Sequence, residues 1–235
     1  MKKIGLIGGM SWESSIEYYR IINQQVREAL GGVHSARSVM VSVDFGEIEK
    51  LQAQGEWAEA TRILVQCAKE VEGAGADFFL ICTNTMHLMA DEVQAAVEIP
   101  LLHIADATAR VVQRFGLTRV GLLGTRFTME EDFYRGRLES IHGLQVVIPD
   151  EGGRELVHQV IYEELVQGKI RNVSREGYLG VIDSLVEEGA EGIILGCTEI
   201  GLLIKESDLL LPVFDTMEIH ALAAVDAALG RYDLS

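Results

Sequence analysis

The chain contains little proline, cysteine or positive charge, and it has no long apolar segment. Its 235 residues include three prolines and three cysteines, and 20 lysines and arginines stand against 36 aspartates and glutamates. The net charge of −16 argues against nucleic acid or an anionic membrane as a partner. No apolar run reaches membrane-spanning length. Because nearly half of the residues are apolar, we expect a sizeable packed core, in one large domain or in two of about a hundred residues each.

The three cysteines are Cys67, Cys82 and Cys197, and their spacing fits neither a metal site nor a disulfide framework. A reducing cytoplasm suits such a set. The first eight residues resemble the start of a signal peptide, but their apolar run is short and Trp12 and Glu13 follow at once. We therefore expect a first strand at this position and a cytoplasmic protein.

Apolar strands, polar turns and amphipathic helices alternate along the whole chain. Strands are predicted over 3–8, 39–43, 78–82, 100–103, 119–123, 144–148, 193–195 and 212–214. Helices are predicted over 11–30, 57–74, 86–97, 106–115, 129–141, 151–166, 173–188 and 216–229, and a polar, partly helical loop over 45–54. This alternation indicates an α/β protein with mostly parallel sheets.

Two pairs of segments repeat at nearly the same distance. Thr83 follows one apolar strand and Cys197 follows another 114 positions later, while Gly5 and Gly121 lie 116 positions apart in similar strands. We infer a duplicated unit, that is, two pseudosymmetric doubly wound domains over 1–115 and 116–215, with the C-terminal helix in 216–235 packing back on the first. The active site is expected in the cleft between them, at the strand ends.

Cys197 occupies a position that suits a reactive thiol. It lies at the predicted carboxyl end of a buried strand and near a helix N-terminus, where exposed N–H groups and the helix dipole favour a thiolate. The alternative is a buried structural cysteine. A Gly8-Gly9 turn after the first strand could likewise let backbone N–H groups approach an anion.

Four segments together resemble the aspartate/glutamate racemase family. They are residues 8–14 (GGMSWES), 83–87 (TNTMH), 124–129 (GTRFTM) and 196–199 (GCTE). The order and spacing of these segments follow the family along the whole chain, with greatest similarity to the branch of L-aspartate/glutamate-specific racemases. The resemblance implies two pseudosymmetric α/β domains, no cofactor, no metal, a homodimer and a small amino-acid substrate. It also implies two catalytic residues, one on each side of the substrate Cα.

By this resemblance Cys197 is the thiolate base and Thr83 the opposing proton donor. A thiol is a reasonable base because its ordinary pKa of about 8.5 lies within reach of neutrality, and hydrogen bonds must stabilise charge that builds on the substrate carboxylate. The remaining substrate-binding candidates are Met10, Gln52, Asn84, Thr85, Thr125, Thr128, Thr198 and Glu199. Met10 would bind through its backbone, and Gln52 is the candidate for the distal carboxylate. Several of these threonines could instead serve only as helix caps.

The chain also departs from the family pattern. Thr83 stands where most members have cysteine, and Cys82 precedes it by one residue, so on a strand the two side chains point to opposite faces. We expect Cys82 in the core. Glutamate racemases have an Asp-Ser-Gly motif near the start and a Gly-Cys-Thr-His motif later, and at these motifs this chain has Met10 and Glu199 instead. Val166 stands where some members have a lysine for the distal carboxylate. His87 and His103 are expected to be structural.

Three classes of function remain open. The first is an amino-acid racemase acting on L-aspartate or L-glutamate. The second is another carbanion enzyme of the same superfamily, such as a hydantoin racemase, a maleate isomerase or an arylmalonate decarboxylase. The third is a binding protein that kept the fold and lost the reaction. The Gly-Cys-Thr-Glu setting of Cys197 favours the first.

Overall fold

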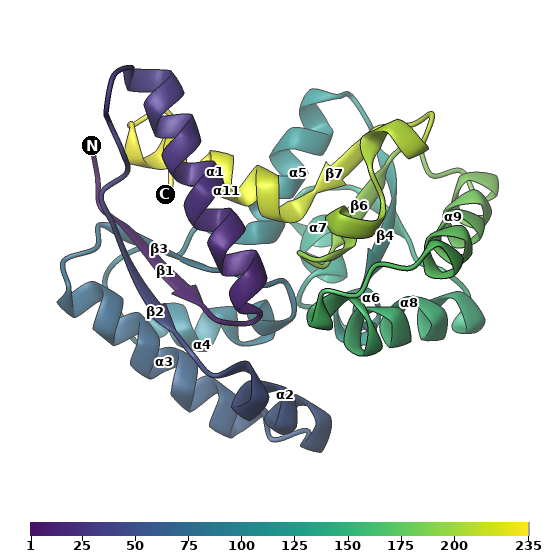
Figure 1. Ribbon diagram of the computed structural model, residues 1–235, viewed down its shortest axis with the longest axis horizontal. Coiled ribbons are helices and arrows are strands. Elements are labelled where there is room, and N and C mark those ends of the chain that lie inside the picture. The colour runs from purple at the N-terminus through teal and green to yellow at the C-terminus, as the bar shows by residue number, and fades with distance from the viewer. Residues whose placement is uncertain (235) are drawn as a thin grey trace. The chain divides into compact units, whose positions relative to one another are not determined.

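The computed structural model describes residues 1–234, which form two compact α/β units (Figure 1). The first unit comprises Met1–Ile104 together with the residues from His220 onward, and the second comprises Ala105–Ile219. One unit holds a three-stranded parallel sheet and the other a four-stranded parallel sheet. The predicted α/β class with two parallel sheets is thereby confirmed. None of the helices in the described part of the chain combines the length and apolar character that crossing a lipid bilayer requires.

The sheet of the first unit has its first strand at the centre. Its strand order is β2-β1-β3, with β1 over Ile4–Gly8, β2 over Ser38–Ser42 and β3 over Phe78–Ile81. Every residue of β1 and β3 is buried, which explains why both read as continuous apolar runs. The strand predicted at 100–103 is wrong. Only Leu101 forms a bridge, with Phe79, and Pro100 has no N–H group that could extend the pairing before it.

Helices cover both faces of this sheet. They are α1 (Trp12–Leu30), α2 (Phe45–Gln54), α3 (Trp57–Gly73), α4 (Ala90–Ala95) and the part of α11 (Thr216–Ala228) that begins at His220. Helices α3 and α4 lie on one face of the sheet and α1 and α11 on the other (Figure 1). The Tyr18 hydroxyl of α1 hydrogen-bonds to His220 of α11 at 2.9 Å, and the Lys2 N–H donates to the Ala228 carbonyl at 2.9 Å. These contacts attach the C-terminal helix to the first unit.

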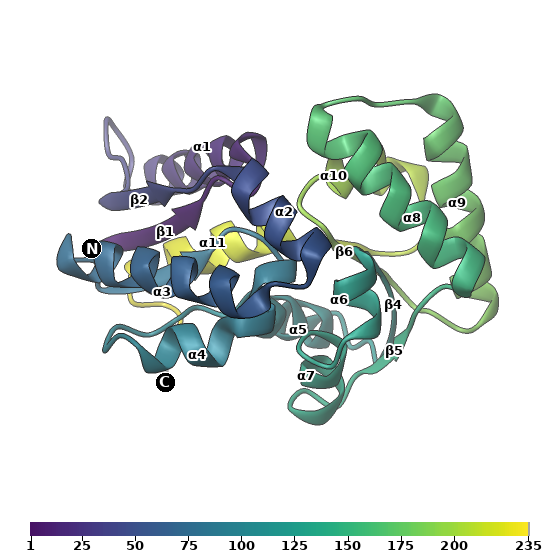
Figure 2. The same ribbon diagram turned by 90° about the horizontal axis from the view of Figure 1, so that it is seen from below.

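The second unit repeats the arrangement with one additional strand. Its sheet has the order β5-β4-β6-β7, with β4 over Arg119–Gly124, β5 over Gln145–Val147, β6 over Ile193–Gly196 and β7 over Val213–Asp215. Its helices are α5 (Ile104–Arg114), α6 (Arg126–Glu130), α7 (Arg135–Ser140), α8 (Glu151–Glu163), α9 (Asn172–Glu187) and α10 (Ile200–Leu203). Helices α8 and α9 lie on one side of the sheet and α5 and α7 on the other (Figure 2).

Strand β1 in the first unit and strand β4 in the second have corresponding partners, as the internal repeat predicts. In the first unit Ile7 of β1 pairs with Ile81 of β3, and in the second Gly124 of β4 pairs with Gly196 of β6. Parallel pairing brings the carboxyl ends of paired strands to one edge of a sheet. The polar segments that follow β1 and β3 are therefore neighbours, and so are those that follow β4 and β6.

Two expected boundaries differ from the structure. The units divide before Ala105, whereas the boundary was expected near Gly116. From Ala105 onward, helix α5 belongs with the second unit, where Asp106 pairs with Arg137. The helix predicted over 129–141 is two short helices, and the acidic run at residues 130–132, whose like charges repel, accompanies the break.

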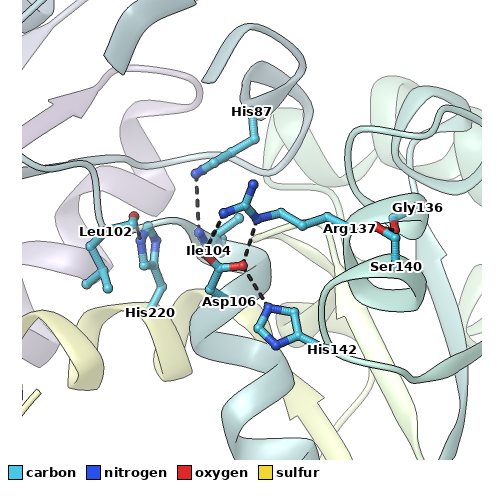
Figure 3. Close-up of polar contacts among 9 residues, drawn as sticks. All are labelled: His87, Leu102, Ile104, Asp106, Gly136, Arg137, Ser140, His142 and His220. Carbon is cyan, nitrogen blue, oxygen red and sulfur yellow. Dashed lines mark hydrogen bonds and ion pairs between the residues drawn. The ribbon is translucent and has the colours of Figure 1, made fainter. Parts of the chain in front are cut away.

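A carboxylate on α5 joins that helix to α7 and to the turn after it. Asp106 accepts two hydrogen bonds from Arg137, both at 2.7 Å, and one from His142 at 2.8 Å (Figure 3). Burial alone would raise the pKa of Asp106, but the hydrogen bonds from Arg137 and His142 outweigh it and hold the pKa below its usual range. Ionised Asp106 therefore stabilises the folded second unit.

We predict that Asp106→Asn lowers the free energy of unfolding by about 1–2 kcal/mol at pH 7, since charge-assisted hydrogen bonds are lost. A carboxylate whose pKa is lower in the folded protein than in the unfolded chain, where it is about 3.9, stabilises the fold at pH values above about 3.9. This stabilisation is lost as the pH falls through the folded-state pKa. The difference between wild type and variant should thus shrink as the pH falls below about 4. Thermal unfolding at pH 7, 5 and 3 measures it. Asp183→Asn on the exposed side of α9 is the control, and a difference that persists at pH 3 would contradict the prediction.

Candidate functional site

The polar segment after β3 begins with a fully buried and a half-buried residue. The Cys82 N–H donates to the Ile7 carbonyl at 2.9 Å, so the strand pairing continues through this residue. Cys82 is fully buried, while the next side chain, Thr83, is half-buried. The expectation that Cys82 lies in the core is therefore confirmed. Burial raises the pKa of the Cys82 thiol far above its ordinary value, and so Cys82 is a core residue that does not supply a thiolate.

Asn84 and Thr85 follow at the start of a short 3₁₀ helix, Thr85–Met89. Both side chains are at least nine-tenths buried. The Thr83 carbonyl hydrogen-bonds to the ring of His87 at 2.8 Å, and the His87 N–H donates to the Asn84 carbonyl at 3.0 Å. The helix expected over 86–97 is thus a 3₁₀ turn followed by α4.

The loop between β1 and α1 lies beside this segment because β1 and β3 are paired. Ser11 caps α1 by accepting a hydrogen bond from the Ser14 N–H, and the Gly9 N–H donates to the Ser15 hydroxyl at 2.8 Å. Gly9 has a φ of 94°, and a Cβ there would lie 2.2 Å from the Val43 carbonyl oxygen, so only glycine fits. Met10 is buried, and the Met10–Ser11 peptide bond is cis.

Gln52 is buried on α2, not solvated on a loop. Its side chain is 6% exposed, and its amide Nε2 donates to the Met86 sulfur at 3.1 Å. A thioether is a weak acceptor. A carboxylate oxygen offered to the same N–H would make a stronger hydrogen bond.

In the second unit, β6 leads directly into the segment with the candidate thiol. Cys197, Thr198 and Glu199 follow Gly196 and are all at least nine-tenths buried, with Cys197 at 9% exposure. The Cys197 thiol donates to Glu199 Oε2 at 3.0 Å, and the Thr198 hydroxyl donates to the same oxygen at 2.8 Å. One buried carboxylate oxygen thus accepts from both neighbouring side chains.

In the free protein Cys197 is held as a protonated thiol, and its role as a base stays a prediction. Burial raises the pKa of its thiol well above the ordinary value, and the negative charge of Glu199 and its hydrogen bond raise it further. Helix α10 spans only Ile200–Leu203, so its dipole is small. Cys197 therefore rests as a protonated thiol that has a carboxylate as its immediate proton acceptor.

Thr125 and Thr128 lie beside this segment at the end of β4. The Thr125 hydroxyl caps α6 by accepting from the Thr128 N–H, and the two hydroxyls are 3.2 Å apart. Paired Gly124 and Gly196 allow this packing, since a Cβ on Gly196 would lie 2.8 Å from the Leu123 carbonyl oxygen and 3.2 Å from the Thr128 methyl. The helix-capping role expected as the alternative for Thr125 is present in the structure.

Asp215 is a titratable group that the sequence reasoning missed. It ends β7 opposite Leu195 and accepts from the Met217 N–H, and the next residue, Thr216, donates to the Leu195 carbonyl at 2.8 Å. Removal from water raises the pKa of Asp215 to about 6 despite the backbone hydrogen bonds that lower it, and its charge adds to the raised pKa of Cys197. The available signal was a carboxylate directly after the apolar run 212–214.

Each unit therefore gathers its own subset of the candidates at the carboxyl edge of its sheet. Met10, Thr83, Asn84 and Thr85 follow β1 and β3, with Gln52 joined to them through Met86. Thr125, Thr128, Cys197, Thr198 and Glu199 follow β4 and β6. Within residues 1–234, no three His, Cys, Asp or Glu side chains are grouped so that they could hold a metal ion.

Comparison with known proteins gives a consistent result. The family model for Asp/Glu/Hydantoin racemase matches residues 7–224. A crystal structure from Yersinia pestis, named a "putative Asp/Glu Racemase", has a TM-score of 0.91 and 55% identity, covering 97% of this chain and 100% of that chain. An aspartate racemase homologue from Pyrococcus horikoshii OT3 has a TM-score of 0.84 and 38% identity with the same coverage. The broad specificity amino-acid racemase RacX of Bacillus subtilis (strain 168) is 22% identical over 179 residues, 73% of this chain and 74% of RacX.

We predict that Glu199→Gln lowers the pKa of the Cys197 thiol, because the neutral amide removes the negative charge that disfavours the thiolate. Burial still acts, so the pKa should fall without reaching that of an exposed cysteine. The rate of Cys197 alkylation by iodoacetamide, followed by mass spectrometry across pH, measures the change. Glu188→Gln, at an exposed position, is the control. An alkylation profile that is the same for wild type and Glu199→Gln would contradict the prediction.

Proposed function

Because this chain belongs to the Asp/Glu/hydantoin racemase family, we propose that it racemises an acidic amino acid, L-aspartate or L-glutamate, without a cofactor. Relatives named as amino-acid racemases support the reaction class. The observation that carries the proposal is the buried hydrogen bond from the Cys197 thiol to Glu199. A nucleophile or base held beside its own proton acceptor, away from water, is the arrangement that proton abstraction requires.

Cys197 acts as the base after it transfers its proton to Glu199. The thiol proton moves along the 3.0 Å hydrogen bond, which leaves a thiolate and a neutral carboxylic acid. The ammonium group of the bound substrate favours this transfer, since a nearby positive charge stabilises the thiolate. The thiolate then takes the Cα proton and becomes a thiol again, while the electron pair remains on Cα and the substrate carboxylate.

Thr83 gives a proton to the opposite face of Cα. Its hydroxyl bond breaks as the new C–H bond forms. The proton that Thr83 loses is replaced from solvent, and Glu199 releases to solvent the proton that it took from Cys197, so both side chains return to their starting states. A threonine hydroxyl resists ionisation, so Thr83 is a usable acid and a poor base. In the reverse direction the D enantiomer meets this poor base first.

The other candidates hold the substrate. Asn84 and Thr85 in one unit and Thr125, Thr128 and Thr198 in the other supply hydroxyl, amide and backbone N–H donors for the carboxylate on which charge builds. Met10 contributes its backbone. Gln52 takes the distal carboxylate, which replaces the Met86 sulfur as the acceptor of its amide.

The oligomeric state and the compartment are part of the same proposal. We expect a homodimer because members of the family are commonly dimers. Helix α1 carries an exposed stripe of large side chains, Trp12, Ile16 and Tyr19, that dimerisation would cover. Free cysteines at positions 67, 82 and 197 are consistent with a reducing cytoplasm.

Cys197→Ala should abolish both exchange of the Cα hydrogen and racemisation, because the base for the L substrate is removed. Glu199→Gln should lower both by about 10²–10⁴-fold, the usual size of a general-base effect. Proton NMR in deuterated water, with L-aspartate and L-glutamate as substrates, measures exchange, and chiral chromatography measures inversion. Cys82→Ala is the matched control, a buried thiol whose loss should cost on the order of 1 kcal/mol of stability and leave most activity. If Cys197→Ala exchanged the Cα hydrogen at the wild-type rate, the proposed mechanism would be wrong.

If the wild type shows no exchange with any acidic amino acid, the proposed reaction is wrong. Exchange with a hydantoin or a substituted malonate in the same assay would then indicate another carbanion enzyme. Binding without exchange would leave a small-molecule-binding protein.

The weak base at Thr83 should separate exchange from inversion. An isolated pair of enantiomers has an equilibrium constant of one, so kcat/KM is equal in the two directions and a poor base on one face slows racemisation both ways. Cys197 alone can still remove and return a proton. We predict that the L substrate exchanges with retention faster than it racemises, and that the D substrate exchanges no faster than it inverts. Thr83→Cys should raise racemisation and narrow the gap. Equal exchange from both enantiomers in the wild type would show that Thr83 is not the weak side.

A further inference from the structure

His87 lies four residues after Thr83 and is bound at both ring nitrogens. Its side chain is 2% exposed and extends from the 3₁₀ helix Thr85–Met89. The ring Nδ1 is 2.8 Å from the Thr83 carbonyl oxygen. The Ile104 N–H donates to Nε2 at 3.3 Å, a contact drawn in Figure 3.

These two contacts fix the tautomer of the ring. A backbone N–H can only donate, so Nε2 carries the lone pair that accepts from Ile104. A carbonyl oxygen can only accept, so Nδ1 carries the hydrogen and donates to Thr83. His87 is therefore a neutral imidazole, and the ring of His103, with its centroid 4.5 Å away at an interplanar angle of 61°, packs against it.

The hydrogen bond to Thr83 sets the orientation of a peptide group at the candidate site. The Thr83 carbonyl belongs to the same peptide as the Asn84 N–H. A donor on that carbonyl fixes the plane of the peptide and polarises its N–H. Thr83 lies between the end of β3 and Asn84, the residue that precedes the 3₁₀ helix Thr85–Met89. A change in the Thr83 backbone torsion would therefore change the direction of its side chain relative to this peptide.

We propose that His87 is a positioning residue that holds the Thr83 hydroxyl in line with the substrate Cα. This inference rests on the proposed function. It assigns a role to a third residue beside Cys197 and Thr83, and that residue acts only on the proton transfer by Thr83. Since Cys197 is in the other unit of the chain, loss of the His87 hydrogen bond should impair inversion and spare the proton exchange that Cys197 performs alone.

An isosteric pair of substitutions tests the inference. Asparagine and leucine have the same branched shape, and asparagine places an N–H donor near the position of Nδ1, whereas leucine has none. Wild type, His87→Asn and His87→Leu are compared for L-substrate exchange and for inversion on the same samples. The ratio of inversion to exchange does not depend on the fraction of protein that is folded, so a loss of stability does not disturb it.

The His220→Leu variant is the matched control. His220 is fully buried in the same unit, and one ring nitrogen hydrogen-bonds to the Tyr18 hydroxyl. The other hydrogen-bonds to the Leu102 carbonyl, as Figure 3 shows. Neither of these two hydrogen bonds involves Thr83. The His220 ring also lies edge-on to the His87 ring, with centroids 6.0 Å apart, so this variant removes packing against His87 and keeps the His87 hydrogen bond to Thr83. Replacement of His220 should therefore lower stability and leave the ratio of inversion to exchange unchanged.

We expect His87→Leu to lower the ratio of inversion to exchange by about 10–100-fold, the size of effect that a misplaced reacting group produces. In the His87→Asn variant the ratio should recover most of the wild-type value. Equal loss of inversion and exchange in His87→Leu, or the same ratio in the Asn and Leu variants, would overturn the inference and leave the proposed function intact. An absence of exchange in the wild type would overturn both.

Discussion

Parallel pairing of two buried strands in each sheet places nearly every candidate residue. Because β1 pairs with β3, the polar segments that follow these two strands reach one edge of the first sheet. In the same way, the segments that follow the paired strands β4 and β6 reach one edge of the second sheet. The close approach of β4 and β6 depends on glycine at the last paired position, since a Cβ on Gly124 would lie 2.9 Å from the Gly196 carbonyl oxygen. The apolar strands supply the rigidity, and the short turns after them carry the chemistry.

Strand positions and side-chain direction could be predicted from the sequence because they depend on local periodicity. The buried strands read as apolar runs, and the core position of Cys82 followed from strand geometry alone. The division before Ala105 could not be predicted in this way, because it depends on the pairing of Asp106 with a distant arginine. The burial of Gln52 likewise depends on tertiary packing.

The protonation of the thiol could not be predicted from the sequence for a related reason. A helix N-terminus is visible in the sequence, but the length of α10 and the removal of Cys197 from water are not. Desolvation and two carboxylates, of which Asp215 comes from a separate strand, outweigh the small dipole of a short helix. Sequence patterns identified which groups meet at the sheet edge, whereas their protonation depends on solvent exclusion and on residues that are distant in the chain.

The protonated state of Cys197 has a consequence for the durability of the protein. Peroxides attack the thiolate form of cysteine, and attack also requires access to the sulfur. Cys197 is 9% exposed, so peroxide has little access to its sulfur. Burial and the neighbouring carboxylates raise its pKa, so little thiolate is present. The sulfur is thus kept in the form that is hardest to oxidise to sulfenic acid. Deprotonation only on arrival of a positively charged ligand would confine its reactive form to the time when the site is filled.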